Sequence, residues 1–390
     1  MGRSDKTALS WHRIVIKVGT STLTAGAGKL NPPRMVDFCR QLACLRQQGV
    51  EVVLVSSGAQ QAGRERLGYP RGNKSIPVKQ MLAAVGQSRL MHLWEQYSEL
   101  YDMVVAQVLL TREDVEDRHR YLNLRDTFES LLQHGIVPIV NENDAVATDE
   151  IKVGENDSLS AMVANLIQAD LLILLTDTDG LYTADPSVDH NATLIEHVEQ
   201  IDAGVYELAT GSKSGLGTGG MYTKIVAADM AVHSGTSVVI TNGGREDVLS
   251  RIVGCTLSAT LPPEPAIPAT WFTASITPAE GQKRWLLAQR VPAGCVRVDE
   301  GAANAIVSGG KSLLPVGIVE VEGRFERGAL ITVRTREGTA GASREIARGL
   351  ANYSADDLHR IRGQQSVRIA DILGYDYGPD FIHRDKMVLL

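Results

Sequence analysis

A lysine follows an apolar run near the start of the chain, at the point where a buried strand would end. The run Ile14–Ile16 leads into Lys17, and Gly19 and two hydroxyl residues come directly after Val18. A glycine lets backbone approach a ligand closely, and a cationic side chain beside glycine and hydroxyl groups suits a phosphate. A surface lysine at an ordinary strand end would show the same pattern, so this segment alone leaves both interpretations open.

A second polar segment, Ser57, Gly58 and Ala59, follows the apolar run Val52–Val55 and leads into the expected helix Gln60–Leu67. The N-terminus of a helix presents unpaired backbone N–H groups that can bind a carboxylate or a phosphate. Ser57 could equally be a simple helix cap, which is the commoner role. The ligand interpretation gains weight because open α/β sheets bind ligands at the carboxyl ends of their strands.

Asparagine and acidic residues crowd behind the apolar run Val137–Val140. Asn143 and Asp144 follow it closely, and Asn156 lies further along in a second polar stretch. Such side chains can receive an ammonium group and order a small polar substrate, which we favour over a plain solvated loop. Their spacing gives no metal cage, so we expect any Mg²⁺ to be held partly by phosphates and water, and its protein ligands stay open.

A further strand end suits a nucleotide. The apolar run Leu171–Leu175 ends in Thr176 and Asp177, again at the position where α/β sheets bind ligands. The residues that follow, Asp179 and Gly180, are typical of an ordinary turn.

A glycine-rich stretch, residues 214–224, opens the expected helix Ile225–Val232. Its glycines formally match the G-x-G-x-x-G fingerprint, but they follow a polar segment rather than a strand, which argues against a Rossmann dinucleotide site. No Gly-Lys-Ser/Thr ends the stretch, so it is not a P-loop either. Flexible backbone with Thr223 and Lys224 at a helix start suits nucleotide phosphates, and the helix that follows directly argues against a disordered linker.

The elements between these segments must position them. Short apolar runs alternate with amphipathic stretches from Arg13 to about Ala259, which predicts an α/β domain with a mostly parallel sheet and helices on both faces. The expected strands are Ile14–Ile16, Val50–Val55, Met103–Leu109, Ile136–Val140, Leu171–Leu175 and Ser237–Ile240, and the expected helices include Met35–Gln48, Val78–Tyr97 and Asn123–Gln133.

The composition changes after this first domain, which spans residues 1–259. Residues 260–280 hold five of the chain's 14 prolines, which predicts a linker. Short alternating segments separated by glycine-rich turns then predict a small β-rich domain over residues 281–360. That domain has 12 Lys and Arg against 9 Asp and Glu, a net charge of +3, which leaves −10 for the rest of the chain. Residues 361–390 are a polar tail that the pattern does not place.

Length and composition limit the class of protein. The 390 residues, 44% hydrophobic and 22% charged, suit a globular chain of two domains and exclude a fibre or a disordered chain. A net charge of −7 argues against a generic cationic nucleic-acid binder. The chain has four dispersed cysteines, a charged N-terminus without an apolar run and no apolar stretch of membrane-spanning length, so we expect a cytoplasmic protein with no membrane partner.

Taken in order, these motifs resemble those of the amino acid kinase family. The likeness rests on Ile16–Ser21, Ser57–Ala59, Leu82–Gln87, Asn141–Ala147 and Gly217–Lys224, and it covers nearly the whole chain together with Ser312–Gly317 and Gly323–Gly328, which resemble a PUA domain. The resemblance implies the amino acid kinase fold, a mostly parallel sheet sandwiched by helices, followed by a small β-rich PUA-like domain.

Within that family, the motifs are most similar to those of members that phosphorylate the γ-carboxylate of L-glutamate with ATP and Mg²⁺, the first step of proline biosynthesis. The resemblance implies ATP contacts at Lys17, Thr176, Asp177, Thr218, Gly219, Gly220, Met221, Tyr222, Thr223 and Lys224. It implies contacts with the amino acid substrate at Ser57, Gly58, Ala59, Asp144 and Asn156. It also implies a homo-oligomer (a dimer or a tetramer), feedback inhibition by proline and functional coupling to glutamyl phosphate reductase. Glu155 stands where the family pattern leads us to expect aspartate.

The chemistry of such a transfer needs positive charge rather than a general base. A glutamate side chain has a pKa of about 4.3, so it is already ionised at neutral pH. Lys17 and Lys224, with Mg²⁺, are the expected catalytic charges, and Asp177 is the acidic residue predicted to hold the two lysines apart. Ser57 and the adjacent helix N–H groups are expected to bind a substrate carboxylate, while Asp144 takes the substrate ammonium group.

Two alternative functions stay open. A kinase of another small carboxylate, such as N-acetylglutamate, would not need an ammonium acceptor at Asp144. An RNA-binding or RNA-modifying protein is the other alternative, because PUA domains often occur with RNA. The small net charge of this domain and its lack of an aromatic stacking series disfavour RNA as a partner and favour a structural or regulatory role.

Overall fold

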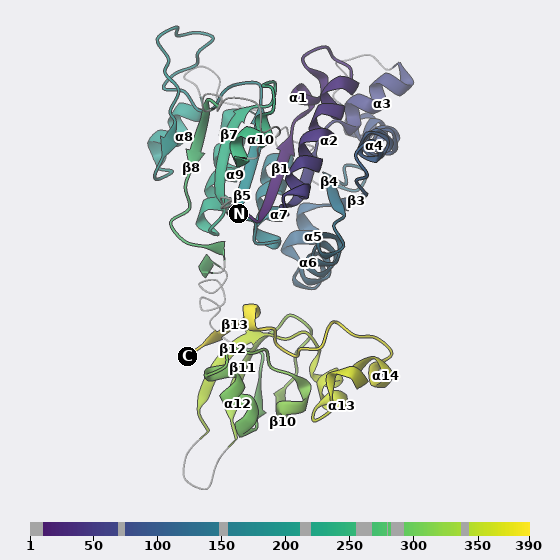
Figure 1. Cartoon of the computed structure of the whole chain (residues 1–390), viewed down its shortest axis with the longest axis vertical. Helices are drawn as coiled ribbons and strands as arrows, with labels where there is room; N and C mark the ends of the chain where they lie inside the picture. Colours follow the sequence, from purple (N-terminus) through teal and green to yellow (C-terminus); the bar gives the residue numbers. More distant parts are fainter. Residues whose placement is uncertain are drawn as a thin grey trace, which may run out of the picture. The chain divides into compact units, whose positions relative to one another are not determined.

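The chain folds into two compact units, residues Met1–Pro278 and Ala279–Leu390, each with its own sheet (Figure 1). The computed structural model describes residues 11–68, 75–147, 155–210, 220–254, 267–278, 280–281, 292–336 and 343–390. The two units are described separately below.

The first unit is built on an eight-stranded sheet with the order β3-β4-β2-β1-β5-β7-β8-β6. Its strands are β1 (Arg13–Val18), β2 (Glu51–Ser56), β3 (Val105–Leu110), β4 (Val137–Glu142), β5 (Leu171–Thr176), β6 (His197–Val198), β7 (Ser237–Asn242) and β8 (Ala269–Phe272). All neighbours from β3 to β7 pair in parallel, and β8 pairs antiparallel to β7. The prediction of a mostly parallel sheet is therefore confirmed.

The helices of this unit lie between its strands along the chain. They are α1 (Thr20–Thr24), α2 (Pro32–Gln47), α3 (Ala59–Leu67), α4 (Ile76–Glu99), α5 (Arg112–Glu116), α6 (Arg118–Gln133), α7 (Glu155–Leu166), α8 (Ala203–Thr210), α9 (Met221–His233) and α10 (Val248–Val253). Local sequence explains several starts: the Asn31 side chain accepts a hydrogen bond from the backbone N–H of Arg34, and Pro32 suits the first turn of α2. No helix in the described part of the chain is both long and apolar enough to cross a membrane.

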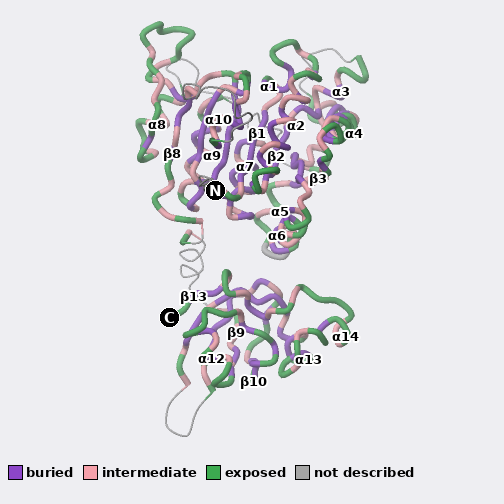
Figure 2. The backbone as a smooth tube through the Cα atoms, in the orientation of Figure 1, coloured by how far each residue is buried: buried purple, intermediate pink, exposed green. Residues whose placement is uncertain are grey.

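Alternating side chains of the central strands form two cores, one on each face of the sheet. On β1, Ile14 and Ile16 pack with α2, α3, α4 and α10, whereas Val15 packs on the other face with α6, α7 and α9. Figure 2 shows these central strands as buried. Because both faces of these strands are buried, their sequences are continuous apolar runs. Full burial of each such side chain stabilises the fold by about 1.5–3 kcal/mol.

Two glycines let α3 and α4 cross with their backbones in contact. A Cβ at Gly86 would lie 1.7 Å from the carbonyl oxygen of Ala59, and a Cβ at Gly63 would lie 2.0 Å from that of Leu82. Real Cβ atoms do not approach so closely, so only glycine fits at either position. This crossing fixes the start of α3, which directly follows the Ser57 segment.

The second unit is a five-stranded sheet with the order β10-β9-β11-β12-β13. Its elements are β9 (Gly294–Val298), α12 (Glu300–Val307), β10 (Ile318–Gly323), β11 (Leu330–Thr335), β12 (Glu345–Leu350), α13 (Ala355–Ile361), α14 (Ile369–Leu373) and β13 (Met387–Leu389), with 3₁₀ turns at Pro315–Gly317, Ser366–Arg368 and Arg384–Lys386. Among the described strands of this unit, β9 and β11 pair in parallel and the other neighbours pair antiparallel. This is the small β-rich unit that the sequence predicts.

Two segments differ from the predicted organisation. The stretch 260–280, predicted as a linker, contains β8, whose Phe272 is buried in the core of the first unit; residues 255–266 lie outside the described part. The prolines flank this strand rather than interrupt it. The tail, residues 361–390, belongs to the second unit, because β13 pairs with β12 and Phe381 is fully buried.

Candidate active site

The parallel strands bring four of the polar segments to one edge of the sheet. Lys17 lies near the carboxyl end of β1, Thr176 ends β5 beside it, and Ser57 follows β2 on the other side. Asn141 lies at the end of β4, the next strand beyond β2. Because parallel strands point the same way, side chains that are far apart in the sequence share this edge.

Two lysines meet one carboxylate at this edge. The Nζ atom of Lys17 lies 2.6 Å from Oδ1 of Asp157, and the Nζ atom of Lys224 lies 3.2 Å from its Oδ2. Thr223 donates a hydrogen bond of 2.7 Å to the same Oδ2. Asp157 is 1% exposed, Lys17 6% and Lys224 8%, so the three charges are almost removed from water.

The starts of two helices place these groups. Asp157 lies in the first turn of α7, Thr223 and Lys224 lie in the first turn of α9, and α7 packs against both α9 and β1. Two cations around one anion leave a net charge of +1, which suits an anionic phosphoryl group.

Charge and burial act in opposite directions on this cluster. Burial raises the pKa of Asp157, but the charges of Lys17 and Lys224 outweigh it and hold that pKa below its ordinary value. Burial lowers the pKa of Lys17, with a further lowering by Lys224 that Asp157 opposes. A bound triphosphate would add negative charge and favour the protonated form of Lys17.

The residue between the lysines is therefore Asp157, not Asp177 as predicted. Asp177 is exposed, and its carboxylate accepts a hydrogen bond of 3.1 Å from the hydroxyl of its neighbour Thr176. In the sequence, Asp177 follows an apolar run and Asp157 follows a polar stretch, so the pattern does not separate the two acids. The sequence also does not show that the start of α7 packs against α9. That packing decides which acid reaches the lysines.

Asn156, one residue before Asp157, is held by two other polar side chains. Its Nδ2 donates to Oγ of Ser57 at 2.8 Å and to Oδ1 of Asn141 at 3.0 Å. Its own Oδ1 is buried without a hydrogen-bond donor among the described residues. A buried free acceptor beside a substrate site is suited to an ammonium group.

Asn141 continues this contact towards the helix α4. Its Nδ2 donates to Oε1 of Gln87 at 2.9 Å, and Nε2 of Gln87 donates to Oε1 of Gln107 at 3.2 Å. The sequence motifs included Asn141 and Gln87 without giving either a role. The sequence signal for either residue is its position within a motif, close to residues with a predicted role.

Asp144 lines a cavity of about 260 Å³ at the same edge of the sheet. Ala59, Gln87 and Asn143 also line it, together with Ala83, Ala84, Ser88, Gln107, Leu109, Glu142 and Ala145. Burial raises the pKa of Asp144, and a hydrogen bond with Gln60 opposes this. A carboxylate that burial disfavours gains most from a cationic partner.

Gly58 provides the sharp turn between β2 and α3. Its φ of 112° is a conformation that favours glycine, and a Cβ there would contact Leu23, Leu30 and Leu90 at 3.4 to 3.7 Å. The turn presents Ser57 and the N–H groups at the start of α3 to the site.

The glycine-rich stretch is described only in part. Thr218 and Gly219 lie outside the described residues, whereas Gly220 caps α9 and Met221, Tyr222, Thr223 and Lys224 form its first turn. The ring of Tyr222 lies 5.8 Å from that of Tyr206 on α8. The structure therefore joins this stretch to the lysine cluster through Thr223 and Lys224.

The turn at Asp179 and Gly180 has more contacts than the sequence suggests. Arg245 donates to both carboxylate oxygens of Asp179, at 2.8 and 2.7 Å. A Cβ at Gly180 would lie 2.3 Å from Oγ1 of Thr270. The turn is thus packed against β8 and held by an ion pair to the loop after β7.

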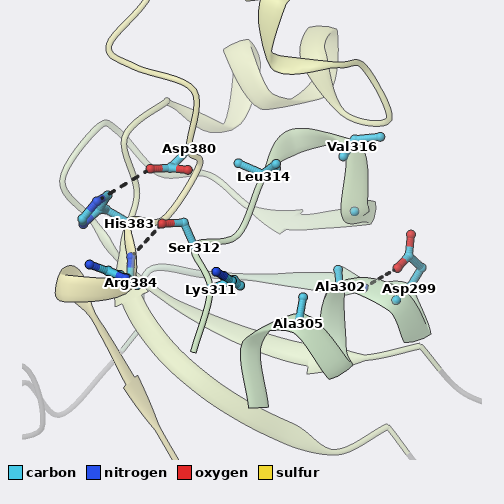
Figure 3. Close-up of a pocket in the computed structure, with 12 residues that line it drawn as sticks. Asp299, Ala302, Ala305, Lys311, Ser312, Leu314, Val316, Asp380, His383 and Arg384 are labelled. Carbon is cyan, nitrogen blue, oxygen red and sulfur yellow. Dashed lines mark hydrogen bonds and ion pairs between the residues drawn. The ribbon is translucent and has the colours of Figure 1, made fainter. Parts of the chain in front are cut away.

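A separate cavity of about 680 Å³ lies in the second unit (Figure 3). Small residues of α12, among them Ala302 and Ala305, form one wall, and Leu314 and Val316 form an apolar rim. Figure 3 shows His383 and Arg384 at the opposite end, where Oγ of Ser312 accepts from the backbone N–H of Arg384, and Lys311 between them and the alanines of α12. None of these residues was singled out for a role by the sequence.

The fold and the lysine cluster define an amino acid kinase. The family model described as "Amino acid kinase family" matches residues 12–242, and that described as "PUA domain" matches residues 294–373. The chain belongs to the amino acid kinase family, with a PUA domain in its second unit.

Relatives within this family carry one name. The chain is 50% identical to "Glutamate 5-kinase" of Shewanella sediminis over 98% of this chain and 99% of the relative. It is 50% identical to the protein of the same name from Herpetosiphon aurantiacus, over 96% and 98%, and 49% identical to that from Deinococcus radiodurans, over 97% and 100%. A solved structure of UMP kinase from Ureaplasma parvum matches with a TM-score of 0.44 and 14% identity, covering 67% of this chain and 99% of that one.

Proposed function

We propose that this chain transfers the γ-phosphoryl group of ATP to the γ-carboxylate of L-glutamate, forming L-glutamyl 5-phosphate and ADP in the first step of proline biosynthesis. The observation that carries the proposal is the buried cluster of Lys17, Asp157 and Lys224 beside the acceptors Asp144 and Asn156. Its occurrence in a chain about 50% identical to named glutamate 5-kinases over nearly its whole length supports the choice of substrate.

The transfer step balances without a general base. A γ-carboxylate oxygen of glutamate forms a bond to the γ-phosphorus, and the bond from that phosphorus to the β,γ-bridging oxygen breaks and releases ADP. The carboxylate is already ionised at neutral pH, so no proton has to leave it. The activation barrier arises mainly from the negative charge on the phosphoryl oxygens and on the departing ADP.

Lys17 and Lys224 are the groups that neutralise this charge. Both cations are almost fully buried, so their interaction with a phosphoryl group is screened little by water. Asp157 binds both lysines, which prevents either ammonium group from folding away when the nucleotide is absent. Thr176, Asp177 and Gly220 to Thr223 are proposed ATP contacts, together with Thr218 and Gly219.

Mg²⁺ enters this proposal as part of the substrate MgATP. Phosphate oxygens and water are the ligands that Mg²⁺ prefers, usually with few protein groups. Within the described residues, no cluster of three or more His, Cys, Asp or Glu side chains could hold a metal ion.

The amino acid is bound through its two α-substituents. Asp144 and Oδ1 of Asn156 are proposed to accept from the α-ammonium group, because burial disfavours the Asp144 carboxylate and Oδ1 has no donor among the described residues. Ser57 and the N–H groups at the start of α3, a helix of nine residues, are proposed to bind the α-carboxylate with Gly58 and Ala59.

The hydroxamate assay tests the reaction directly. An acyl phosphate reacts with hydroxylamine, so ATP, Mg²⁺ and glutamate should give glutamyl hydroxamate. Turnover of N-acetylglutamate or carbamate without turnover of free glutamate would overturn the substrate assignment. The Asp144 carboxylate already disfavours N-acetylglutamate, since that substrate has no ammonium group.

The proposal includes three properties that follow from the family resemblance. These are a homo-oligomer (dimer or tetramer), feedback inhibition by proline and functional coupling to glutamyl phosphate reductase, which would consume a hydrolysis-prone acyl phosphate. Repeating the hydroxamate assay with proline, and measuring mass in solution, would test the first two. A cytoplasmic location is also part of the proposal.

RNA binding by the second unit is the competing proposal. Lys311 and Arg384 beside the apolar wall of the 680 Å³ cavity are the feature that favours it. For the second unit, we favour a structural or regulatory role over RNA binding. Tight, salt-dependent retention of RNA by the full chain in a filter-binding assay would reverse that preference.

A further inference from the structure

A chain of side-chain amides runs from the substrate edge to the helix α4, and all its hydrogen bonds point the same way. Asn156 donates to Asn141, Asn141 donates to Gln87, and Gln87 donates to Gln107. We call Asn156, Asn141 and Gln87 the amide relay. Its members come from α7, β4 and α4, which Figure 1 shows in the same half of the first unit.

The direction of the relay decides what Asn156 offers to a ligand. Both hydrogens of its amide are used, one towards Ser57 and one towards Asn141. Only the buried Oδ1 is left, and it accepts nothing from the described residues. With the amide turned over, Oδ1 of Asn156 would face Oδ1 of Asn141, so the reversed state requires Asn141 to turn over as well.

Gln87 opposes that second turn. Its Oε1 accepts from Nδ2 of Asn141 at 2.9 Å, so a reversed Asn141 would place two carbonyl oxygens against each other unless Gln87, and then Gln107, turned over as well. Gln87 directly follows Gly86, whose backbone contact with α3 leaves no room for the helix to shift. The packing of α3 on α4 therefore holds the backbone that carries Gln87, and the bonds to Asn141 and Gln107 orient its side chain.

We propose that Gln87 is a positioning residue that acts through Asn141 to keep Oδ1 of Asn156 as a free acceptor, and thereby selects substrates with a free α-ammonium group. This inference rests on the proposed glutamate kinase activity. Gln87 also lines the cavity that contains Asp144, which places this member of the relay at the same cavity as the carboxylate. Asp144 supplies the charge, and the relay supplies an acceptor with a fixed direction.

The test compares glutamate with glutarate, which has the same two carboxylates and no ammonium group. In Gln87→Met the acceptor for Asn141 is lost, and kcat/KM for glutamate should fall about tenfold or more through KM. The value for glutarate, or its inhibition constant if it is not turned over, should change less than about threefold, as should kcat and the KM for ATP.

Two further variants separate the relay from a packing effect. Gln87→Glu keeps an acceptor for Asn141, so its discrimination between glutamate and glutarate should stay within about threefold of the parent. Gln96→Met removes an exposed glutamine from the same helix outside the relay and should match the parent. Thermal unfolding of each variant verifies folding, and Gln87→Leu is the second apolar variant if Gln87→Met does not fold.

The outcomes are distinguishable. Equal losses for glutamate and glutarate in Gln87→Met, or loss of discrimination in Gln87→Glu, would overturn the inference and leave the glutamate kinase activity standing. A parental KM in Gln87→Met would overturn it too. A parent enzyme that makes no glutamyl hydroxamate would overturn the proposed function and the inference together.

Discussion

Asp157 shows how one buried carboxylate can organise a reaction centre without taking part in proton transfer. It holds two lysines from different elements, and each lysine alone would be an unpaired buried charge. The cluster is therefore stable before substrate arrives and is already arranged for the transition state. This is the sense in which electrostatic stabilisation is preorganised.

Replacing Asp157 should damage turnover far more than replacing Asp177. In Asp157→Asn the lysines lose their common anchor, and we expect kcat to fall about a hundredfold or more. In the matched variant Asp177→Asn, which alters an exposed proposed ATP contact bonded to Thr176, kcat should change less than about threefold and any loss should fall on the KM for ATP. Hydroxamate formation measures both, and the reverse ranking would restore Asp177 as the residue that orients the lysines.

Asp144 should make glutamate binding depend on pH. Burial raises its pKa, so in the free enzyme it becomes protonated at a higher pH than an exposed aspartate and then cannot pair with an ammonium group. As pH falls through that raised pKa, kcat/KM for glutamate should fall, while the KM for ATP changes less. Asp144→Asn should show only the titration of the substrate, together with a KM for glutamate about tenfold higher at neutral pH.

The same shift has a defined sign for stability. Between the ordinary and the raised pKa, the folded protein binds more protons at Asp144 than the unfolded chain, so this residue lowers stability as pH rises through that range. Asp144→Asn should therefore unfold at an equal or higher temperature at neutral pH. A lower unfolding temperature would show that Asp144 stabilises the free fold.

At the scale of elements, the crossing of α3 and α4 connects packing to binding. Ala59 begins α3 immediately after the Ser57 segment, and Gly86 approaches its carbonyl oxygen too closely for any side chain. Glycine within a helix costs about 1 kcal/mol relative to alanine. The close crossing offsets that cost at Gly86.

Gly86→Ala should separate the two helices. We expect a loss of about 3 kcal/mol in the free energy of unfolding, because a methyl group is forced onto backbone. The KM for glutamate should rise more than that for ATP, since Ala59 and Ala83 line the Asp144 cavity. Gly204→Ala in α8 is the control: of the residues that the structure describes, only Asp202 comes near, with its carboxylate, and stability should be unchanged or slightly higher.

At the scale of the whole molecule, the first unit contains every described residue of the proposed site. Each unit has its own core, and β8 completes the sheet of the first one. The boundary of the first unit therefore lies after β8, at Pro278 rather than at residue 259.

Two truncations test that boundary. A fragment of residues 1–278 should fold and form glutamyl hydroxamate. A fragment of residues 1–259 lacks Phe272, whose loss from the core costs about 3–5 kcal/mol, and it should be unfolded or strongly destabilised. Circular dichroism melts compare them, and equal stability would show that β8 does not belong to the core of this unit.

The sequence was sufficient for the α/β class and for the positions of the strand ends. Apolar runs such as Leu171–Leu175 have the length and two-sided hydrophobicity of central strands, and each is followed by polar residues. Lys17, Ser57 and Thr176 could be placed near the same edge because parallel strands end on the same side. The sequence does not predict the strand β8, because the five prolines of residues 260–280 are typical of a linker. The short strand among them pairs antiparallel to β7.

What the sequence determined by itself is local: the period of each element, the turns that require glycine, and the polar residues at each strand end. Only the tertiary structure decided that Asp157 rather than Asp177 meets the lysines, because that contact depends on how α7 packs against β1 and α9. It likewise decided the direction of the amide relay, in which Asn156 and Gln87 belong to helices from distant parts of the chain. Short-range preferences set backbone geometry within a few residues, whereas contacts between distant residues exist only once the hydrophobic cores have brought their elements together.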